Sequence, residues 1–388
     1  MTILNCLTDE KFFNSMIQIF ESEKGSHSIE YAILTDTQVS LNHIKCDVNI
    51  RQIPTNHFIE YVANNGIDAV IIHNLRSVPQ ELIWLIPAKV KVIWFGWGFD
   101  LYTWPDNIRP LIRLKTLILP KTKNALTRID PLYRLRELHA FFYNLLHIRD
   151  TRKIIERIDY FAGVFPIEFD LIKINHGFHA KKLIFNYGCS SSDYQPNKIS
   201  EFEPCTGLNI LLGNSGDVSN NHLDVMEELA CLNLKSRKII VPLSYGGSQA
   251  YKDIVKSRGK ELWGENFVAL DTFLPLNEYK RIISSCGNVI MGHIRQQASE
   301  NIEINIWNGR KVFFYESSIG FKHYSDLGFI VRSIEHNLTN EELNKPLTLS
   351  EAENNRRIMV SYNGTDANIS NFHKIISTLE ADIKSQIK

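Results

Sequence analysis

The chain has 388 residues, which is enough for two domains of ordinary size. Its 43 Lys and Arg balance its 43 Asp and Glu, so overall charge gives no attraction for nucleic acid. The six cysteines are scattered without a Cys-x-x-Cys pair, which argues against a disulfide framework or a zinc site and is typical of a reducing cytoplasm.

The N-terminus and the hydropathy pattern indicate a protein without membrane spans. The first residues, "MTILNCLTDEKFF", carry acids where a secretory signal carries bases. No apolar run approaches the roughly 18 residues that a membrane span needs. We therefore expect a soluble chain whose contact with a membrane, if it makes one, is peripheral.

Short apolar runs alternate with helical patterns through the first half, which is typical of an α/β protein with parallel sheets. A long helical stretch is predicted from about residue 108 to 158. The predicted strands of this half are 2–7, 29–35, 48–53, 69–73, 90–95, 160–164 and 182–185.

A second α/β pattern follows a polar, proline-containing linker at 196–207. Its predicted strands are 208–212, 238–242, 266–270, 288–291 and 311–315. The pattern predicts two Rossmann-like domains, at 1–195 and 208–330, with a ligand cleft beyond the carboxyl ends of the strands. Helices are expected over 331–388, and packing of these helices back on the first domain is one possible arrangement.

The string "LLGNSGDVSNNH" (211–222) directly follows a predicted strand and precedes a predicted helix. Its glycines and asparagines permit unusual backbone angles and close approach of a ligand. N–H groups at the start of such a helix favour phosphate, and Ser219 or Asn220 is suited to cap it. The pattern predicts an anion-binding turn, with an ordinary strand–helix turn as the alternative.

The string "GHIRQQASENIEINIW" (292–307) begins where another strand is predicted to end. Arg295 offers a charged fork for a phosphate, and Gln296 and Gln297 offer hydrogen bonds to sugar hydroxyls. A short helix is predicted to follow. The alternative is a surface loop with a solvated arginine.

Two further residues at predicted strand ends are candidates for acid–base chemistry. Asp100 follows "VIWFGWGF", and His73 follows "AVII" on the preceding strand. Either is a candidate general base for a sugar hydroxyl. The alternatives are a helix-capping Asp and a structural His.

Basic residues are concentrated between Arg109 and Arg157, with twelve Lys or Arg against four Asp or Glu. They are interleaved with apolar residues, as in "LYRLRELHAFFYNLLHIR". This pattern predicts contact with an anionic membrane surface or a lipid diphosphate. The alternative is a solvated helix face over a core.

Several sequence patterns are absent. The "GWGFDL" string lacks the third glycine of a dinucleotide fingerprint, and no P-loop string occurs. There is also no Asp-x-Asp, no clustered His and Cys, and no Gly-x-Ser-x-Gly elbow. A bound diphosphate is therefore expected to be neutralised by helix N-termini and arginine, without a metal or cofactor.

Taken together, "ILLGNSGDVSNNH", "VPLSYG" with "AYKDIV", "IRQQ" and "WGFDLY" resemble the TDP-N-acetylfucosamine:lipid II N-acetylfucosaminyltransferases. That family transfers 4-acetamido-4,6-dideoxy-D-galactose from its dTDP-sugar during enterobacterial common antigen assembly. The resemblance is densest between about residues 208 and 314. It implies a GT-B fold, in which an N-terminal acceptor domain and a C-terminal donor domain face each other across a metal-independent site.

The resemblance also implies which residues hold the donor. By analogy with GT-B proteins, the thymine is expected at 270–273. Beyond "RQQ" the chain departs from the glycine-rich turn of the family, and Glu300 or Glu303 is expected to meet the sugar. The implied donor-binding set is Gly213, Asn214, Ser215, Ser219, Asn220, Tyr245, Gly246, Arg295, Gln296, Gln297, Asn301 and Glu303.

We therefore expect a cytoplasmic glycosyltransferase, peripheral at the inner face of the bacterial cell membrane. It would use a dTDP-sugar and a polyprenyl-diphosphate-linked glycan, and no nucleic acid. Because the acceptor half diverges from the family, the acceptor glycan is open: it belongs to the common antigen, an O-antigen or a capsule. The alternatives are another GT-B activity with a different nucleotide sugar, and a non-catalytic module that binds sugar nucleotides or lipids.

Overall fold

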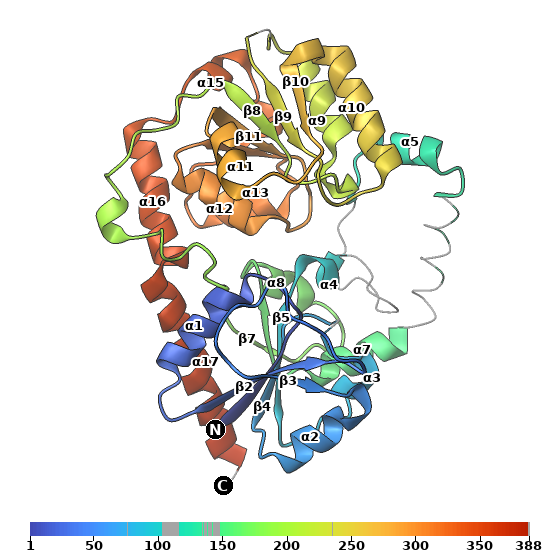
Figure 1. The fold of residues 1–388 in the computed structure, drawn as a ribbon, viewed down its shortest axis with the longest axis vertical. Coiled ribbons are helices and arrows are strands. Elements are labelled where there is room, and N and C mark those ends of the chain that lie inside the picture. Colours follow the sequence, from blue (N-terminus) through green and yellow to red (C-terminus); the bar gives the residue numbers. More distant parts are fainter. Residues whose placement is uncertain are drawn as a thin grey trace. The chain divides into compact units, whose positions relative to one another are not determined.

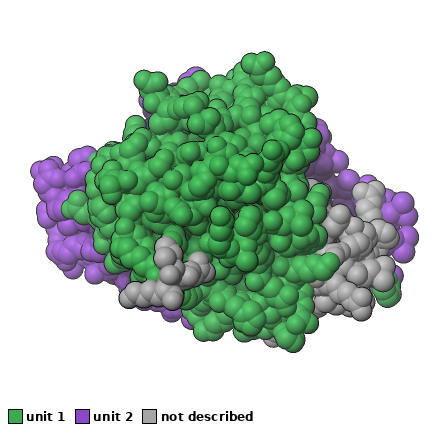
Figure 2. Space-filling view, turned by 90° about the horizontal axis from the view of Figure 1, so that it is seen from below, with its two compact units in different colours: residues 1–113, 140–193, 363–388 green, residues 114–139, 194–362 purple. Residues whose placement is uncertain are grey.

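A computed structural model describes residues 1–75, 77–102, 116–133, 135, 138, 142, 148–234 and 236–386. Two compact units make up the chain and are coloured separately in Figure 2. Unit 1 comprises Met1–Arg113, Ala140–Asp193 and Asn363–Lys388, and unit 2 comprises Leu114–His139 and Tyr194–Tyr362. Among the described residues, no helix is both long and apolar enough to cross a bilayer.

Unit 1 is built on a parallel sheet whose strands have the order β3-β2-β1-β4-β5-β6-β7 (Figure 1). The direction of strand order reverses between β1 and β4, as in a doubly wound fold. The strands are β1 (Thr2–Cys6), β2 (Ser28–Leu34), β3 (Ile50–Ile53), β4 (Ala69–Ile72), β5 (Lys91–Gly96), β6 (Tyr160–Gly163) and β7 (Lys181–Lys182).

Helices cover the sheet of unit 1, and the last helix of the chain is one of them. Phe20 of α1 and Phe372 of α17 bring their ring centroids within 4.6 Å, and both belong to the same buried core. Figure 1 shows the two helices side by side. The helices are α1 (Phe13–Glu23), α2 (Phe58–Asn64), α3 (Gln80–Ile83), α4 (Gly98–Tyr102), α7 (Ile148–Arg157), α8 (Glu168–Ile172) and α17 (Thr365–Gln386), with the 3-10 turn η1 (Thr55–His57).

Unit 2 has a second parallel sheet, with the order β10-β9-β8-β11-β12-β13. The direction of strand order reverses between β8 and β11, which pair directly, with Leu212 opposite Ile290. The strands are β8 (Asn209–Leu212), β9 (Ile239–Pro242), β10 (Phe267–Leu270), β11 (Cys286–Met291), β12 (Lys311–Phe314) and β13 (Arg332–Ser333).

The helices of unit 2 follow the strands in the usual alternation, and α16 ends at the border with unit 1. They are α5 (Pro120–Ile129), α9 (His222–Ala230), α10 (Gln249–Trp263), α11 (Leu276–Ile283), α12 (Ser299–Trp307), α13 (Ile319–Asp326), α14 (Ile334–Asn337), α15 (Asn340–Asn344) and α16 (Leu349–Asn363). Three 3-10 turns accompany them: η2 (Pro196–Lys198), η3 (Val218–Asn220) and η4 (Gly264–Asn266).

The predicted long helix at 108–158 is wrong where the structure describes it. Pro120 occupies the first turn of α5, a position that suits a residue without an N–H. Asp130, with φ −129° and ψ 96°, ends α5 because the following Pro131 disfavours helical backbone there. The side chain of Ala125 is buried in the core of unit 2, so α5 belongs to that unit.

Candidate functional site

The candidate donor site lies at the carboxyl ends of β8 and β11, where the strand order of unit 2 reverses. Ligands of open parallel sheets bind at such a reversal because the loops of two adjacent strands diverge there. The loop after β8 carries the GNSGDVSNNH string, and the loop after β11 carries Arg295, Gln296 and Gln297.

The turn after β8 has a backbone shape that favours glycine at its first position. Gly213 has φ +69°, and a Cβ there would lie 3.0 Å from Asn220 Oδ1 and 3.1 Å from His222 Nε2. Asn220 is fully buried and holds the turn from inside. Its Oδ1 accepts from the N–H of Asn214 at 3.2 Å, and its Nδ2 donates to the carbonyl of Ser215 at 3.0 Å. The conformation of the turn is therefore fixed by the motif's own side chains.

Side chains link this turn to the loop after β11. Gln297 Nε2 donates to Asn214 Oδ1 at 3.0 Å. Ser219 Oγ lies 2.5 Å from Gln297 Oε1 and 2.6 Å from Asp217 Oδ1. Residues 78 positions apart in the sequence thus form one polar network.

The loop after β9 closes on the same turn. The N–H of Gly216 donates to the carbonyl of Tyr245 at 2.8 Å, and Asn214 Nδ2 donates to the Tyr245 hydroxyl at 3.3 Å. A Cβ on Gly247 would lie 2.0 Å from the carbonyl oxygen of Gly216, so the two backbones approach closely. Gly246 also has a positive φ, +70°. The Tyr245 ring remains 54% exposed beside the turn.

Two helices begin at this edge with a strained residue. Among the described residues, Asn221 (φ 50°) and Ala298 (φ 57°) are the non-glycine residues with positive φ, and they are the N-caps of α9 and α12. Neither cap side chain bonds to its helix. Strain of this kind is concentrated at functional sites, and helix N-termini attract anions.

Not every predicted donor residue joins the network around the turn. The partly exposed Arg295 donates from Nη1 to the carbonyl of Gln296, whose side chain is almost fully buried. Glu303 is buried, and its carboxylate contributes to raising the pKa of Tyr324 of α13 well above the usual value, after the larger effect of burial. The carbonyl of Asn301 accepts from Asn305 within α12. The predicted residues that the structure joins in one network are Gly213, Asn214, Ser215, Ser219, Asn220, Tyr245, Gly246 and Gln297.

Two buried histidines support the two loops, and sequence reasoning did not single them out. His222 is fully buried, with Nδ1 at 3.2 Å from the Tyr251 hydroxyl, and burial lowers its pKa to about 4. His293 is buried as well, its Nδ1 lies 3.1 Å from the carbonyl oxygen of Arg295, and burial lowers its pKa to about 4. Both are neutral near pH 7 and contribute shape rather than charge. The position of His222 inside the quoted string was a usable signal.

In unit 1, Asp100 organises the end of β5. Its Oδ2 accepts from the N–H of Leu75 at 3.1 Å, the indole N–H of Trp94 at 3.2 Å and the N–H of Trp97 at 3.3 Å. The residue is fully buried. These contacts bind the ends of β4 and β5 together.

His73 lies in a directional chain of hydrogen bonds. Trp97 Nε1 donates to the Tyr187 hydroxyl at 2.8 Å. The oxygen of this hydroxyl lies 2.9 Å from His73 Nδ1. His73 Nε2 lies 3.1 Å from Asn5 Oδ1. Since the Tyr187 oxygen accepts from Trp97, its proton goes to Nδ1, and Nε2 carries the proton toward Asn5. Burial lowers the His73 pKa to about 3, so a neutral imidazole with no available lone pair results. The prediction of a base at this edge has no support from either residue's surroundings.

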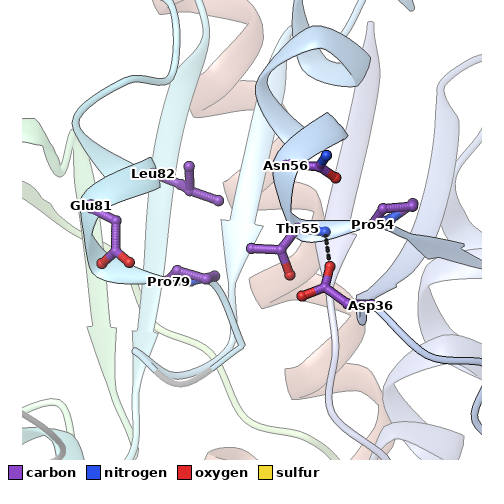
Figure 3. A pocket seen from close by; sticks show the side chains of 7 residues that line it. All are labelled: Asp36, Pro54, Thr55, Asn56, Pro79, Glu81 and Leu82. Atoms are coloured by element: carbon purple, nitrogen blue, oxygen red, sulfur yellow. Dashed lines mark hydrogen bonds between the residues drawn. The ribbon is translucent and has the colours of Figure 1, made fainter.

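A surface hollow of about 560 Å³ lies at the same edge of unit 1, beyond β2 and β3 (Figure 3). Figure 3 shows Glu81 and Leu82 of α3 on one side and Asp36 with Thr55 on the other. Asp36 Oδ1 accepts from the N–H of Thr55 at 2.8 Å. Carboxylate and hydroxyl groups beside apolar Leu and Pro side chains suit a hydroxylated ring, whereas the two carboxylates repel a phosphate.

Part of the basic segment between Arg109 and Arg157 lies outside the described residues. The described part divides between α5 in unit 2 and α7 in unit 1. After α5, three leucines at a spacing of three are more than half exposed. They are Leu132 (55%), Leu135 (59%) and Leu138 (52%).

Residues 134–309 match a family model described as 4-alpha-L-fucosyltransferase, glycosyl transferase group 56. The match includes the turn after β8 and the loop after β11. It confirms the family resemblance for the quoted strings between residues 210 and 297, whereas "WGFDLY" (97–102) lies outside the match.

Solved structures with the same architecture agree on the fold. A sucrose-phosphate synthase from Thermosynechococcus elongatus has a TM-score of 0.60 at 10% identity, covering 98% of this chain and 99% of its own. HepE from Anabaena, solved with UDP and glucose, has a TM-score of 0.59 at 11% identity, covering 97% and 100%. A lipopolysaccharide outer core galactosyltransferase has a TM-score of 0.60 at 8% identity, covering 97% and 99%. The likeness confirms the predicted α/β class and GT-B architecture.

Proposed function

We propose that the chain is a glycosyltransferase with the GT-B fold whose donor is a dTDP-activated 4-acetamido-4,6-dideoxyhexose. Its acceptor in this proposal is a polyprenyl-diphosphate-linked glycan of bacterial surface polysaccharide synthesis, as in the common antigen, an O-antigen or a capsule. The observation that carries the donor half is the shaped turn of Gly213, Asn214 and Ser215 at the strand-order reversal of unit 2.

The donor diphosphate is assigned to this turn and to the start of α12. Backbone N–H groups at a helix start supply fixed partial positive charge, and Arg295 adds a full charge from the neighbouring loop. As the glycosidic bond to the donor breaks, negative charge develops on the departing dTDP, and these groups stabilise it. No step of this account is routed through a metal.

The donor sugar and its thymine base are assigned to the two sides of the turn. Gln297 and Asn301, which are both partly exposed, offer amide groups to the sugar, whereas the side chains of Gln296 and Glu303 are buried. The exposed Tyr245 ring and the backbone of 270–273, which carries the 89% exposed Phe273, are the proposed seat of the thymine. Aromatic side chains beside a turn of this kind provide a flat apolar face for a pyrimidine.

The acceptor is assigned to unit 1. We place its sugars against the hollow of Asp36, Thr55 and Glu81, where carboxylates meet hydroxyl groups. The general base remains a prediction, with Asp100 and His73 as its original candidates. Their burial favours a supporting role for both.

The membrane contact is assigned to the segment that follows α5. Leu132, Leu135 and Leu138 present apolar surface within a stretch rich in arginine, a combination that binds anionic bilayers. We place the enzyme peripherally at the inner face of the cell membrane. Replacing the three leucines with Ser should abolish sedimentation with phosphatidylglycerol vesicles, while the control Ile174→Ser, at an 80% exposed site, should not. Equal sedimentation of both variants would contradict this assignment.

A donor screen tests the proposed reaction. The protein is incubated with dTDP-, UDP- and GDP-sugars and a synthetic polyprenyl-diphosphate glycan, and the product is read by mass spectrometry. Addition of one acetamido-dideoxyhexose from the dTDP donor supports the proposal. Transfer only from a UDP- or GDP-sugar supports the second candidate, another GT-B activity. Donor binding without transfer or hydrolysis supports a non-catalytic module.

A further inference from the structure

We propose that Asn221 is a positioning residue that sets the spacing between the turn after β8 and the Arg295 loop. The inference rests on the proposed donor site. It concerns a residue outside the donor-binding set that the resemblance implies.

The backbone of Asn221 connects η3 to α9 in an unusual conformation. Its φ of 50° and ψ of 39° lie in the left-handed region, which asparagine enters more readily than most residues. Its N–H donates to the carbonyl of Val218 at 3.0 Å, and its carbonyl accepts from Asp224 and Val225. The residue therefore ends one helical turn and begins the next helix.

The fully buried side-chain amide of Asn221 binds only main-chain atoms, on three separate segments. Nδ2 donates to the carbonyl of Gly292 at the end of β11 at 2.9 Å and to that of Ser219 at 3.2 Å. Nδ2 also lies 3.1 Å from the carbonyl of Leu117, and Oδ1 accepts from the N–H of Leu119 at 2.8 Å. Three carbonyls share two protons, so one of these bonds is three-centred.

The contact with Gly292 fixes the distance between the two loops. A Cβ at Gly292 would lie 2.2 Å from the carbonyl oxygen of Asn220, so the end of β11 abuts the turn. Arg295 follows three residues later. An amide that binds both backbones at this point determines how far Arg295 stands from the N–H groups of the turn. Asn221 therefore acts on the diphosphate indirectly, through Arg295 and the N–H groups of the turn.

The start of α9 also holds residues 117–122, a segment from the first half of the chain. Asp224, one turn into α9, accepts from the N–H groups of Lys121 and Thr122 at 2.8 and 2.9 Å. The start of α5 is thereby capped by α9, while Asn221 binds the residues just before it. The donor turn, the end of β11 and the start of α5 are fixed by two side chains at the start of α9, its N-cap Asn221 and Asp224 in its first turn.

Two variants separate positioning from folding. Asn221→Gly keeps the left-handed backbone at no steric cost and removes the amide. Asn221→Asp keeps the shape and the acceptor for Leu119 but sets an oxygen against three carbonyls. The matched control is Asn355→Asp, a fully buried asparagine of unit 2 that also binds backbone, through the N–H and carbonyl of Ile330.

Titration calorimetry with dTDP, UDP and GDP first identifies the nucleotide that the wild-type protein binds. Both Asn221 variants should bind that nucleotide about tenfold more weakly, as expected for lost hydrogen bonds. The KM of the acceptor should be unchanged, and Asn355→Asp should lower the Tm without changing nucleotide affinity.

Three outcomes distinguish the claims. Wild-type affinity in both Asn221 variants overturns the positioning role, and so does an equal loss of affinity in Asn355→Asp. Binding of UDP or GDP in place of dTDP overturns the proposed donor while the positioning role is still measured with the nucleotide that binds. Failure of the wild-type protein to bind any of the three overturns both.

Discussion

The carboxyl edges of the two sheets are built in opposite ways. In unit 2 the edge is a shaped turn, with positive φ at Gly213, Asn221 and Ala298 and backbones in close approach. In unit 1 the polar groups at the strand ends, Asp100 and His73 among them, are buried. Both are linked to Trp97, Asp100 through the Trp97 N–H and His73 through the Tyr187 hydroxyl. The first arrangement suits the binding of an anion by backbone N–H groups, whereas the second stiffens the ends of the strands. This difference is the basis on which we propose that unit 2 binds the charged donor and unit 1 binds the acceptor glycan.

The largest expected effect is on the stability of unit 1. Asp100→Ala removes the acceptor of three buried donors, on Leu75, Trp94 and Trp97. The free energy of unfolding should fall by roughly 3 kcal/mol, measured by urea denaturation. Nucleotide affinity should remain unchanged, because the variant lies outside unit 2. If Asp100→Asn keeps native stability yet loses turnover, Asp100 is a base after all and the contrast between the edges is wrong.

The next effect is on donor binding in unit 2. Gly213→Ala forces a side chain into the left-handed region and against Asn220 and His222. Donor affinity should fall about 100-fold, because a small displacement of a binding turn is costly. The control is Gly66→Ala, which has a similar φ of +64° and no atom within 4 Å of the added Cβ. It should lose about 1 kcal/mol of stability and no affinity. Similar donor affinity in both variants would show that the turn does not bind the donor.

The sequence predicted the shaped edge of unit 2 better than the buried edge of unit 1, for a physical reason. Glycine and asparagine directly after an apolar strand specify local backbone shape, so the turn at Gly213 could be predicted from the sequence. A strand end shows only that Asp100 and His73 share an edge. Whether they point into solvent depends on packing partners such as Tyr187, 114 residues from His73. The docking of α5 on unit 2 depends likewise on Asp224, more than 100 residues away.

A third prediction concerns pH. Burial lowers the pKa of His73 to about 3 and that of His222 to about 4, against 6.5 when unfolded. Below pH 6.5 the unfolded chain therefore binds protons that the folded chain does not. The stability contributed by neutral imidazole is present above pH 6.5 and is lost as the pH falls below it.

Between pH 7 and 5.5, each histidine should cost about 1 kcal/mol of unfolding free energy. Denaturation curves of His73→Phe and His222→Phe should each show a smaller pH dependence than the wild type. An unchanged slope in both variants would mean that these histidines titrate normally in the folded protein.

The smallest effect is expected at the hollow of unit 1. Asp36→Asn with Glu81→Gln should raise the acceptor KM about threefold, since the residues that recognise hydroxyls are exposed. The donor KM should not change. Asp47→Asn, in a second acidic hollow of the same unit, is the control. A changed donor KM, or an equal effect of the control, would remove the hollow from the acceptor site.

The central claim is that the GNSGDVSNNH turn holds the diphosphate of a dTDP-sugar. Calorimetric titration of dTDP into the wild type and into Asn214→Ala with Ser215→Ala tests it most directly. The substitutions remove the contacts of Asn214 with Gln297 and Tyr245 and those of the Ser215 hydroxyl with Asn220. We predict tight binding by the wild type and at least about tenfold weaker binding by the variant at an unchanged Tm. Equal affinity of the two proteins for dTDP would contradict the account.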